Sequence, residues 1–163
     1  MRPRLLLLSF VLIFALNFSC TTTRTGITHA SYVTVTRIVD GDTFWAEDGG
    51  IRGIKIRLIG IDAPETSNSG SKVIGYFGEQ SKEYLTRLIA GKRVSLEFDV
   101  GEKDQYGRTL AYVYLPDGTF VNEELVKNGY AVVMTVPPNV LFAERFLELE
   151  REARIKKKGL WKK

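Results

Sequence analysis

The segment Ile56–Thr66 reads IRLIGIDAPET. It is the stretch of the chain from which a strand end with charged side chains is most clearly predicted. Its start alternates between apolar side chains and Arg57, as expected of a strand, because successive side chains of an extended chain point to opposite faces. Pro64 ends this pattern, since proline has no N–H to give to a sheet. Asp62 and Glu65 lie on either side of the proline. The segment therefore predicts a strand whose end carries one cation and two carboxylates.

Two other polar segments flank this one in the sequence. Residues 39–44 read VDGDTF, and residues 104–112 read DQYGRTLAY. An isolated Asp-x-Pro-Glu would most simply be a solvated strand end and a polar turn. Together, in this order and spacing, the three segments closely resemble the staphylococcal nuclease (thermonuclease) family. The likeness extends from Tyr32 to Trp161.

The pattern of apolar residues predicts that strands dominate the first half of the chain and that two helices close it. The expected strands are Tyr32–Asp40, Thr43–Glu47, Gly53–Ile61, Lys92–Asp99 and Thr109–Leu115. The expected helices are Glu79–Ala90, Val121–Asn128 and Asn139–Lys158, the last with Phe142, Phe146, Leu149 and Ala153 as a buried stripe. Residues 67–78 predict an irregular loop. Periodicity alone supports a mixed α+β domain, and the resemblance implies a mainly β fold, a five-stranded OB-fold barrel with three packed helices.

The first 20 residues are typical of a signal peptide, because a basic start precedes the apolar run Leu5–Leu16. That run is shorter than the roughly 20 residues that span a bilayer. Cys20 stands where a bacterial lipoprotein signal places its lipidated residue. Ser19 fits such a signal, but the residues before it do not, so both secretion and lipidation are open. Residues 21–31 predict a polar linker, and residues 32–161 predict one folded domain.

The composition of the chain disfavours several kinds of catalytic mechanism. The chain has one cysteine, so no disulfide can form within it, and its one histidine, His29, falls in the expected linker. This placement disfavours mechanisms that use a catalytic histidine or zinc held by histidine and cysteine. The formal net charge of +4 includes Arg2 and Arg4 of the expected signal. Nucleic acid would therefore have to bind at local clusters of cations.

Carboxylates of neighbouring strand ends predict a metal site. Asp42 and Asp62 would repel each other if close, unless a cation lies between them. Ligands that are all oxygens favour a hard ion such as calcium or magnesium. The resemblance implies calcium, and it adds the backbone carbonyl of Ala63 as a ligand. It also places Asp40 at the edge of the site, where a turn-capping role is the alternative.

The remaining candidates fit phosphodiester cleavage. Arginine suits a phosphate because its planar fork donates two hydrogen bonds while staying charged, and the resemblance implies this role for Arg57 and Arg108. It implies a general base at Glu65. Tyr106 would contact substrate, and Lys72 is a candidate contact to the nucleic-acid backbone.

One departure from the family concerns the substrate. The family's best-known member carries tyrosines after its second helix that help to hold the nucleotide, whereas this chain has Thr135 and Pro137 there. Stacking on an aromatic ring contributes about 1–3 kcal/mol per base, so base preference and affinity are expected to differ. The metal ligands and the arginines are unaffected by this change.

The resemblance implies an exported, calcium-dependent endonuclease that hydrolyses DNA and RNA and leaves 3′-phosphate ends. The expected protein is a monomer without a protein partner. A second hypothesis is a non-catalytic module with the same fold that binds nucleic acid or protein at the cell surface. A third is a surface-anchored interaction protein with an incidental calcium site, which leaves the paired arginines unexplained. The presence of all five charged motif residues, Asp42, Arg57, Asp62, Glu65 and Arg108, favours the enzyme.

Overall fold

The computed structural model describes residues 31–66 and 75–162. The expected signal with Cys20, most of the linker, and Lys72 lie outside these residues. The strands are β1 (Ser31–Ile38), β2 (Thr43–Glu47), β3 (Ile54–Leu58), β4 (Ile61–Asp62), β5 (Arg93–Glu97), β6 (Thr109–Tyr114) and β7 (Val132–Val133). The helices are α1 (Gly78–Ile89), α2 (Val121–Lys127) and α3 (Ala143–Ile155), followed by the short 3-10 turn η1 (Gly159–Trp161).

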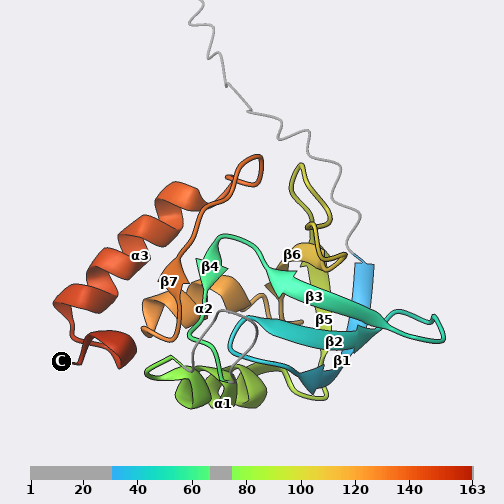
Figure 1. Ribbon diagram of the computed structural model, residues 1–163, viewed down its shortest axis with the longest axis horizontal. Coiled ribbons are helices and arrows are strands. Elements are labelled where there is room, and N and C mark those ends of the chain that lie inside the picture. Colours follow the sequence, from blue (N-terminus) through green and yellow to red (C-terminus); the bar gives the residue numbers. More distant parts are fainter. Residues whose placement is uncertain (1–30, 67–74, 163) are drawn as a thin grey trace, which may run out of the picture.

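Five strands close into a barrel in the order β1-β2-β3-β6-β5 (Figure 1). Neighbouring strands are antiparallel except β3 and β6, which are parallel. Apolar side chains at alternate strand positions fill the interior, including Val35, Phe44, Ile56 and Val94. With three helices packed outside, this arrangement confirms the expected α+β fold and its five-stranded barrel.

The helices pack beside one another, with α2 in contact with α1, α3 and β6. Glycines follow α1 and α2 as the sequence predicts: Gly91 has φ 68° and Gly129 has φ 73°, a conformation in which other residues are strained. None of the helices in the described part of the chain is both long and apolar enough to cross a membrane.

The third helix begins at Ala143, four residues later than the sequence predicts. Residues 134–141 instead form a turn that is tied to the loop after β5. The side chain of Asn139 donates to the carbonyl of Gly101 (2.8 Å) and accepts from its N–H (2.7 Å). Phe142 therefore precedes the helix and is half-buried, whereas Phe146 and the rest of the predicted stripe are buried.

The predicted strand 53–61 is broken in the structure, and this break shapes the site. Gly60 has φ 78°, and a side chain there would collide with the ring of Phe146. The chain turns at this glycine and continues as β4, which pairs with β7 in a small sheet that the sequence did not predict. On α2, the buried side chain of Asn122 donates to the carbonyl of Ile59 (2.9 Å) and so fixes the turn.

Candidate active site

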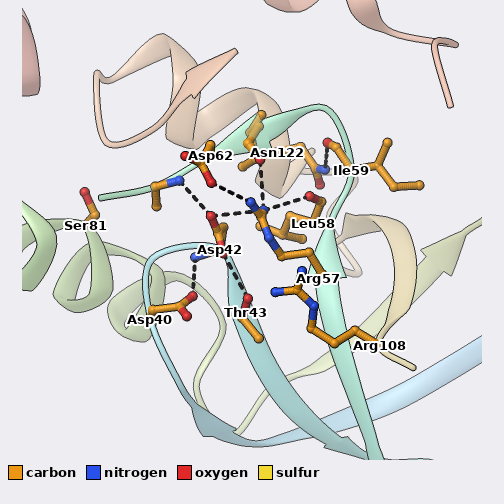
Figure 2. Close-up of polar contacts among 12 residues, drawn as sticks. Asp40, Asp42, Thr43, Arg57, Leu58, Ile59, Asp62, Ser81, Arg108 and Asn122 are labelled. Carbon is orange, nitrogen blue, oxygen red and sulfur yellow. Dashed lines mark hydrogen bonds and ion pairs between the residues drawn. The ribbon is translucent and has the colours of Figure 1, made fainter. Parts of the chain in front are cut away.

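Arg57 lies at the centre of a network that joins two carboxylates (Figure 2). One terminal nitrogen donates to the carbonyls of Leu58 (3.1 Å) and Ile61 (2.8 Å) and lies 3.0 Å from Oδ2 of Asp42. The other donates to Oδ1 of Asp62 (2.8 Å). The side chain is 8% exposed. Arg57 is therefore held by the turn after its own strand and by both of the predicted metal-binding aspartates.

Asp42 is almost fully buried at the start of β2. It accepts hydrogen bonds from the hydroxyl of Thr43 (2.9 Å) and the N–H of Ala63 (2.7 Å), and its own N–H donates to Asp40 (3.1 Å). Burial raises the pKa of Asp42 to about 7, although the neighbouring Arg57 guanidinium acts in the opposite direction. This carboxylate is held in a place where its negative charge is costly, and a cation would relieve that cost.

Glu65 is carried on the turn that follows Pro64. Its carbonyl accepts a hydrogen bond from the N–H of Gly75 (2.9 Å). A side chain at Gly75 would meet Pro64, and one at Gly78 would collide with the carbonyl of Glu65. Only glycine lets the backbone at residues 75 and 78 pack this closely against Pro64 and Glu65. This packing places the start of α1 against the turn at Glu65.

Arg108 reaches the same region from the loop before β6. Its Nε donates to Oδ2 of Asp104 (2.6 Å), and the N–H groups of Tyr106 and Arg108 donate to Oδ1 of Asp104 (2.9 and 3.0 Å). Partial burial raises the pKa of Asp104, but the hydrogen bonds from Arg108 and from the backbone outweigh this effect and lower it. The Arg108 guanidinium lies 5.5 Å from the centre of the Tyr106 ring.

The two groups of residues face each other across a cleft of about 390 Å³. Its lining residues are Asp40, Asp42, Arg57, Asp62, Glu65, Asp104, Gln105, Tyr106, Arg108 and Met134. The structure thus brings together every predicted side chain in its described part. Ala63 is buried next to Asp42 rather than in the lining. The side chain of Arg108 lies below that of Arg57 in Figure 2, on the same side of the barrel.

Asp104 is a site residue for which no role was predicted from the sequence. A local signal was available, because Asp104 lies four residues before Arg108 and Gly107 permits a tight turn between them, with φ 76°. Met134 also lines the cleft and gave no such signal. It arrives through the pairing of β7 with β4, which brings residues distant in the sequence together.

The predicted metal site differs from a preformed carboxylate cage. Among the described residues, no group of three or more His, Cys, Asp and Glu side chains is placed to hold a metal ion. Instead, the guanidinium of Arg57 bridges Asp42 and Asp62. Two converging carboxylates, one of them buried with a raised pKa, nevertheless form an oxygen donor set that suits a hard cation.

Comparison with known proteins identifies the family. Residues 55–163 match the model of staphylococcal nuclease homologues. A thermonuclease of Staphylococcus hyicus is 38% identical over 138 residues, which cover 83% of this chain and 80% of that protein. Endonuclease YncB of Bacillus subtilis (strain 168) is 39% identical over 133 residues, which cover 80% of this chain and 62% of that protein.

A further relative from the same Bacillus subtilis strain is the SPbeta prophage-derived endonuclease YokF. It is 41% identical over 133 residues, which cover 80% of this chain and 44% of that protein. The family inferred from the three motifs is thereby confirmed, together with the expected class of enzyme. The chain belongs to the staphylococcal nuclease family, and its class is that of a hydrolytic nuclease.

Proposed function

We propose that the chain is an exported, calcium-dependent endonuclease that hydrolyses DNA and RNA and leaves 3′-phosphate ends. The observation that carries the proposal is the cleft in which Arg57, Arg108 and Glu65 face one another beside Asp42 and Asp62. Guanidinium groups suit a phosphodiester, and carboxylates suit a cation and an activated water. The relatives named thermonuclease and endonuclease support the same chemistry.

The residues present would hold a calcium ion through Asp42, Asp62 and the backbone carbonyl of Ala63, with Asp40 at the edge. When bound, such an ion supplies positive charge to the phosphate and lowers the pKa of a coordinated water. The all-oxygen donor set favours a hard ion over zinc. The raised pKa of Asp42 fits this role, because a cation would stabilise the charge that burial disfavours.

The protein's own groups would carry the remaining steps. Arg57 and Arg108 would donate hydrogen bonds to the phosphate oxygens on which negative charge increases during attack. Glu65 would accept a proton from the attacking water. The water oxygen forms a bond to phosphorus, and the bond from phosphorus to the 5′-oxygen breaks. The 5′-oxygen leaves with a proton from solvent, and the phosphate stays on the 3′ side.

The test is incubation of the purified protein with single-stranded DNA and RNA, in calcium and in a chelator. Cleavage with 3′-phosphate ends is expected in calcium only. A Glu65→Gln variant keeps the shape of the side chain and removes the base, and it should lower turnover by about 10²–10⁴-fold. Cleavage that continues unchanged in chelator would contradict the metal-dependent mechanism.

The alternative proposal is a non-catalytic module that binds nucleic acid or protein at the cell surface. It predicts that the protein binds an oligonucleotide equally well with and without calcium and cleaves neither DNA nor RNA. The convergence of Arg57, Glu65 and Arg108 on one cleft favours the enzyme, because binding alone does not require a carboxylate beside the phosphate-binding arginines.

Export is part of the proposal because the start of the sequence is typical of a signal peptide. Mass spectrometry of the protein from its native source decides the point. Removal of residues 1–20 is expected for simple secretion, whereas a mature protein that begins at Cys20 and carries a diacylglycerol group there would establish a lipid anchor. An intact Met1 terminus would contradict export by cleavage. A monomer is expected, and the mass in solution tests it.

A further inference from the structure

The outer surface of the barrel carries a row of cationic and aromatic side chains beside the cleft. Trp45 on β2 pairs with Arg37 on β1 and with Lys55 on β3, so these residues stand next to one another across three strands. The Arg37 guanidinium lies 5.8 Å from the centre of the Trp45 ring. Arg37 is exposed, and Trp45 and Lys55 are half-buried. We call these three residues the Trp45 row.

The strand register places the Trp45 row directly beside the cleft. Two residues further along the same strands, Thr43 pairs with Arg57. Side chains two positions apart point to the same face, and the step between them is about 6.6 Å. Since Arg57 lines the cleft, a chain leaving the cleft along this face reaches Lys55 and Trp45 within about the length of one nucleotide. In Figure 1, β1, β2 and β3 lie side by side and form this continuous face.

We propose that the Trp45 row is a further binding site for single-stranded nucleic acid, next to the site of cleavage. Trp45 stacks on an unpaired base, and Lys55 and Arg37 contact the phosphates on either side. Aromatic rings interleaved with cations bind single strands in this way. A base inside a duplex has no free face for the ring, so the site selects unpaired strands. The inference rests on the proposed function for its class of substrate.

An exposed carboxylate limits the Trp45 row in one direction, along β2. In the next row of the same face, Thr34 pairs with Glu47 on one side and with Arg93 on the other. Glu47 is exposed, and its carboxylate repels a phosphate that continues straight along β2. The site is therefore not expected to continue along β2 beyond Trp45.

A purely structural role makes a different prediction. Pairs of arginine and tryptophan across two strands also stabilise a sheet. In that case, removal of the charges lowers the melting temperature and leaves the salt dependence of nucleic-acid binding unchanged. The two roles are therefore separated by a measurement of binding against salt concentration.

The first experiment uses the ring itself as the probe. The chain has two tryptophans, and Trp161→Phe leaves Trp45 as the only one, so excitation selective for tryptophan reports on Trp45 alone. The Nε1 of Trp161 has no hydrogen-bond partner among the described residues, so this change removes no hydrogen bond, and phenylalanine keeps an aromatic ring next to the Arg154 guanidinium. Glu65→Gln is added to prevent cleavage. A single-stranded oligonucleotide of about ten residues is expected to quench Trp45 emission, and a duplex of the same sequence is not.

The second experiment measures the dissociation constant of that oligonucleotide against salt concentration in the Glu65→Gln protein. For single strands the slope of log K against log salt is about 0.7 per neutralised phosphate, so Arg37→Gln with Lys55→Gln should reduce it by about 0.7 for each cation removed. Trp45→Thr should weaken binding roughly ten-fold. Arg87→Gln is the matched control, because Arg87 lies 5.8 Å from the Tyr84 ring on α1, and it should leave the slope unchanged.

The outcomes separate the site from the proposed function. Unchanged Trp45 emission at saturating single strand, equal quenching by the duplex, or an unchanged salt slope in the double variant each overturns the Trp45 row as a binding site. If the double variant does not fold, the test is the quenching of Trp45 emission in the protein that keeps Arg37 and Lys55. If the parent cleaves nucleic acid but Trp45 emission is not quenched, the proposed nuclease function stands and the Trp45 row is not a binding site. Quenching by a protein that cleaves nothing in calcium leaves the row and rejects the nuclease.

Discussion

The two arginines of the cleft are held in opposite ways. Arg57 is buried, and its terminal nitrogens contact two backbone carbonyls and two carboxylates. Arg108 is 27% exposed in its side chain, and its Nε contacts the carboxylate of Asp104 within the same loop. Arg57 is thus part of the barrel's own hydrogen bonding, whereas Arg108 is attached to the barrel through one turn.

The two arginines therefore have different roles in the same site. Removal of Arg57 leaves Asp42 as a buried charge without its ion-pair partner, so both the free energy of unfolding and the turnover should fall. Removal of Arg108 leaves only the partly exposed Asp104, which water can solvate. The stability and the turnover of single variants should therefore separate the two arginines.

Arg57→Met should give the largest loss of stability. Breaking a buried ion pair from one side costs about 3–5 kcal/mol, because the remaining charge stays buried. The loss should shrink as the pH falls, because protonation of Asp42, whose pKa burial raises, removes the uncompensated charge. Denaturant unfolding at pH 8 and pH 5 measures both effects. A stability equal to that of the parent at pH 8 would mean that Arg57 is not needed to compensate the buried carboxylate.

Arg108→Ala should leave the free energy of unfolding nearly unchanged and lower turnover by about 10²–10³-fold, as expected on loss of one donor to the developing charge. Binding of substrate should change much less, since the interaction strengthens in the transition state. Steady-state kinetics on a defined oligonucleotide in calcium measure both parameters. Arg87→Ala, at an exposed arginine of α1 paired with Glu83, is the control. Near-parental turnover of the Arg108 variant would show that Arg108 does not stabilise the transition state.

Local signals in the sequence were sufficient for most of the barrel. The strand Thr43–Glu47 was predicted to the residue, because a turn signal before it and glycines after it limit the alternating stretch. The first helix lies at Gly78–Ile89, one residue from its expected position. The motif residues were identified by their resemblance to a family, and periodicity alone would not have related Asp42 to Arg108.

The features that the sequence did not reveal depend on contacts between distant residues. The break at Gly60 depends on the ring of Phe146, which comes from α3. The late start of α3 depends on the two hydrogen bonds between Asn139 and Gly101. The bridging of Asp42 and Asp62 by Arg57 depends on the turn that brings Asp62 back toward β3. In each case, a residue's role is set by a partner that no local pattern specifies.

Asp42→Asn removes the charge that Arg57 compensates. Because the pKa of Asp42 is raised from 3.8 to about 7, the folded protein binds more protons than the unfolded chain between these values. The free energy of unfolding of the parent should therefore fall as pH rises through this range, by at most about 1.4 kcal/mol for each unit of pKa.

Both proteins are unfolded in chelator at pH 5 and pH 8. The free energy of unfolding of the Asp42→Asn variant should decrease less between these pH values than that of the parent. Calcium at pH 8 should stabilise the parent more than the variant, since the asparagine carries no charge for the ion to relieve. Identical pH dependence of the two proteins would show that Asp42 is already ionised throughout the range, with Arg57 compensating its burial in full.

Tyr106→Ala should have the smallest effect, and its character should differ from that of Arg108→Ala in the same loop. The Tyr106 ring is 75% exposed and lies beside the Arg108 guanidinium, so it can stack on a base without contacting the reacting phosphate. Its loss should weaken binding by about 1 kcal/mol, the lower end for base stacking, and raise KM about five-fold. The value of kcat should stay within about two-fold, because a contact made equally in the ground state and the transition state does not alter the chemical step.

Tyr106→Phe should behave like the parent if the ring surface provides the contact. A large fall in kcat with unchanged KM would show instead that Tyr106 holds Arg108 in position, which would place the ring with Asp104 as a support of the catalytic arginine.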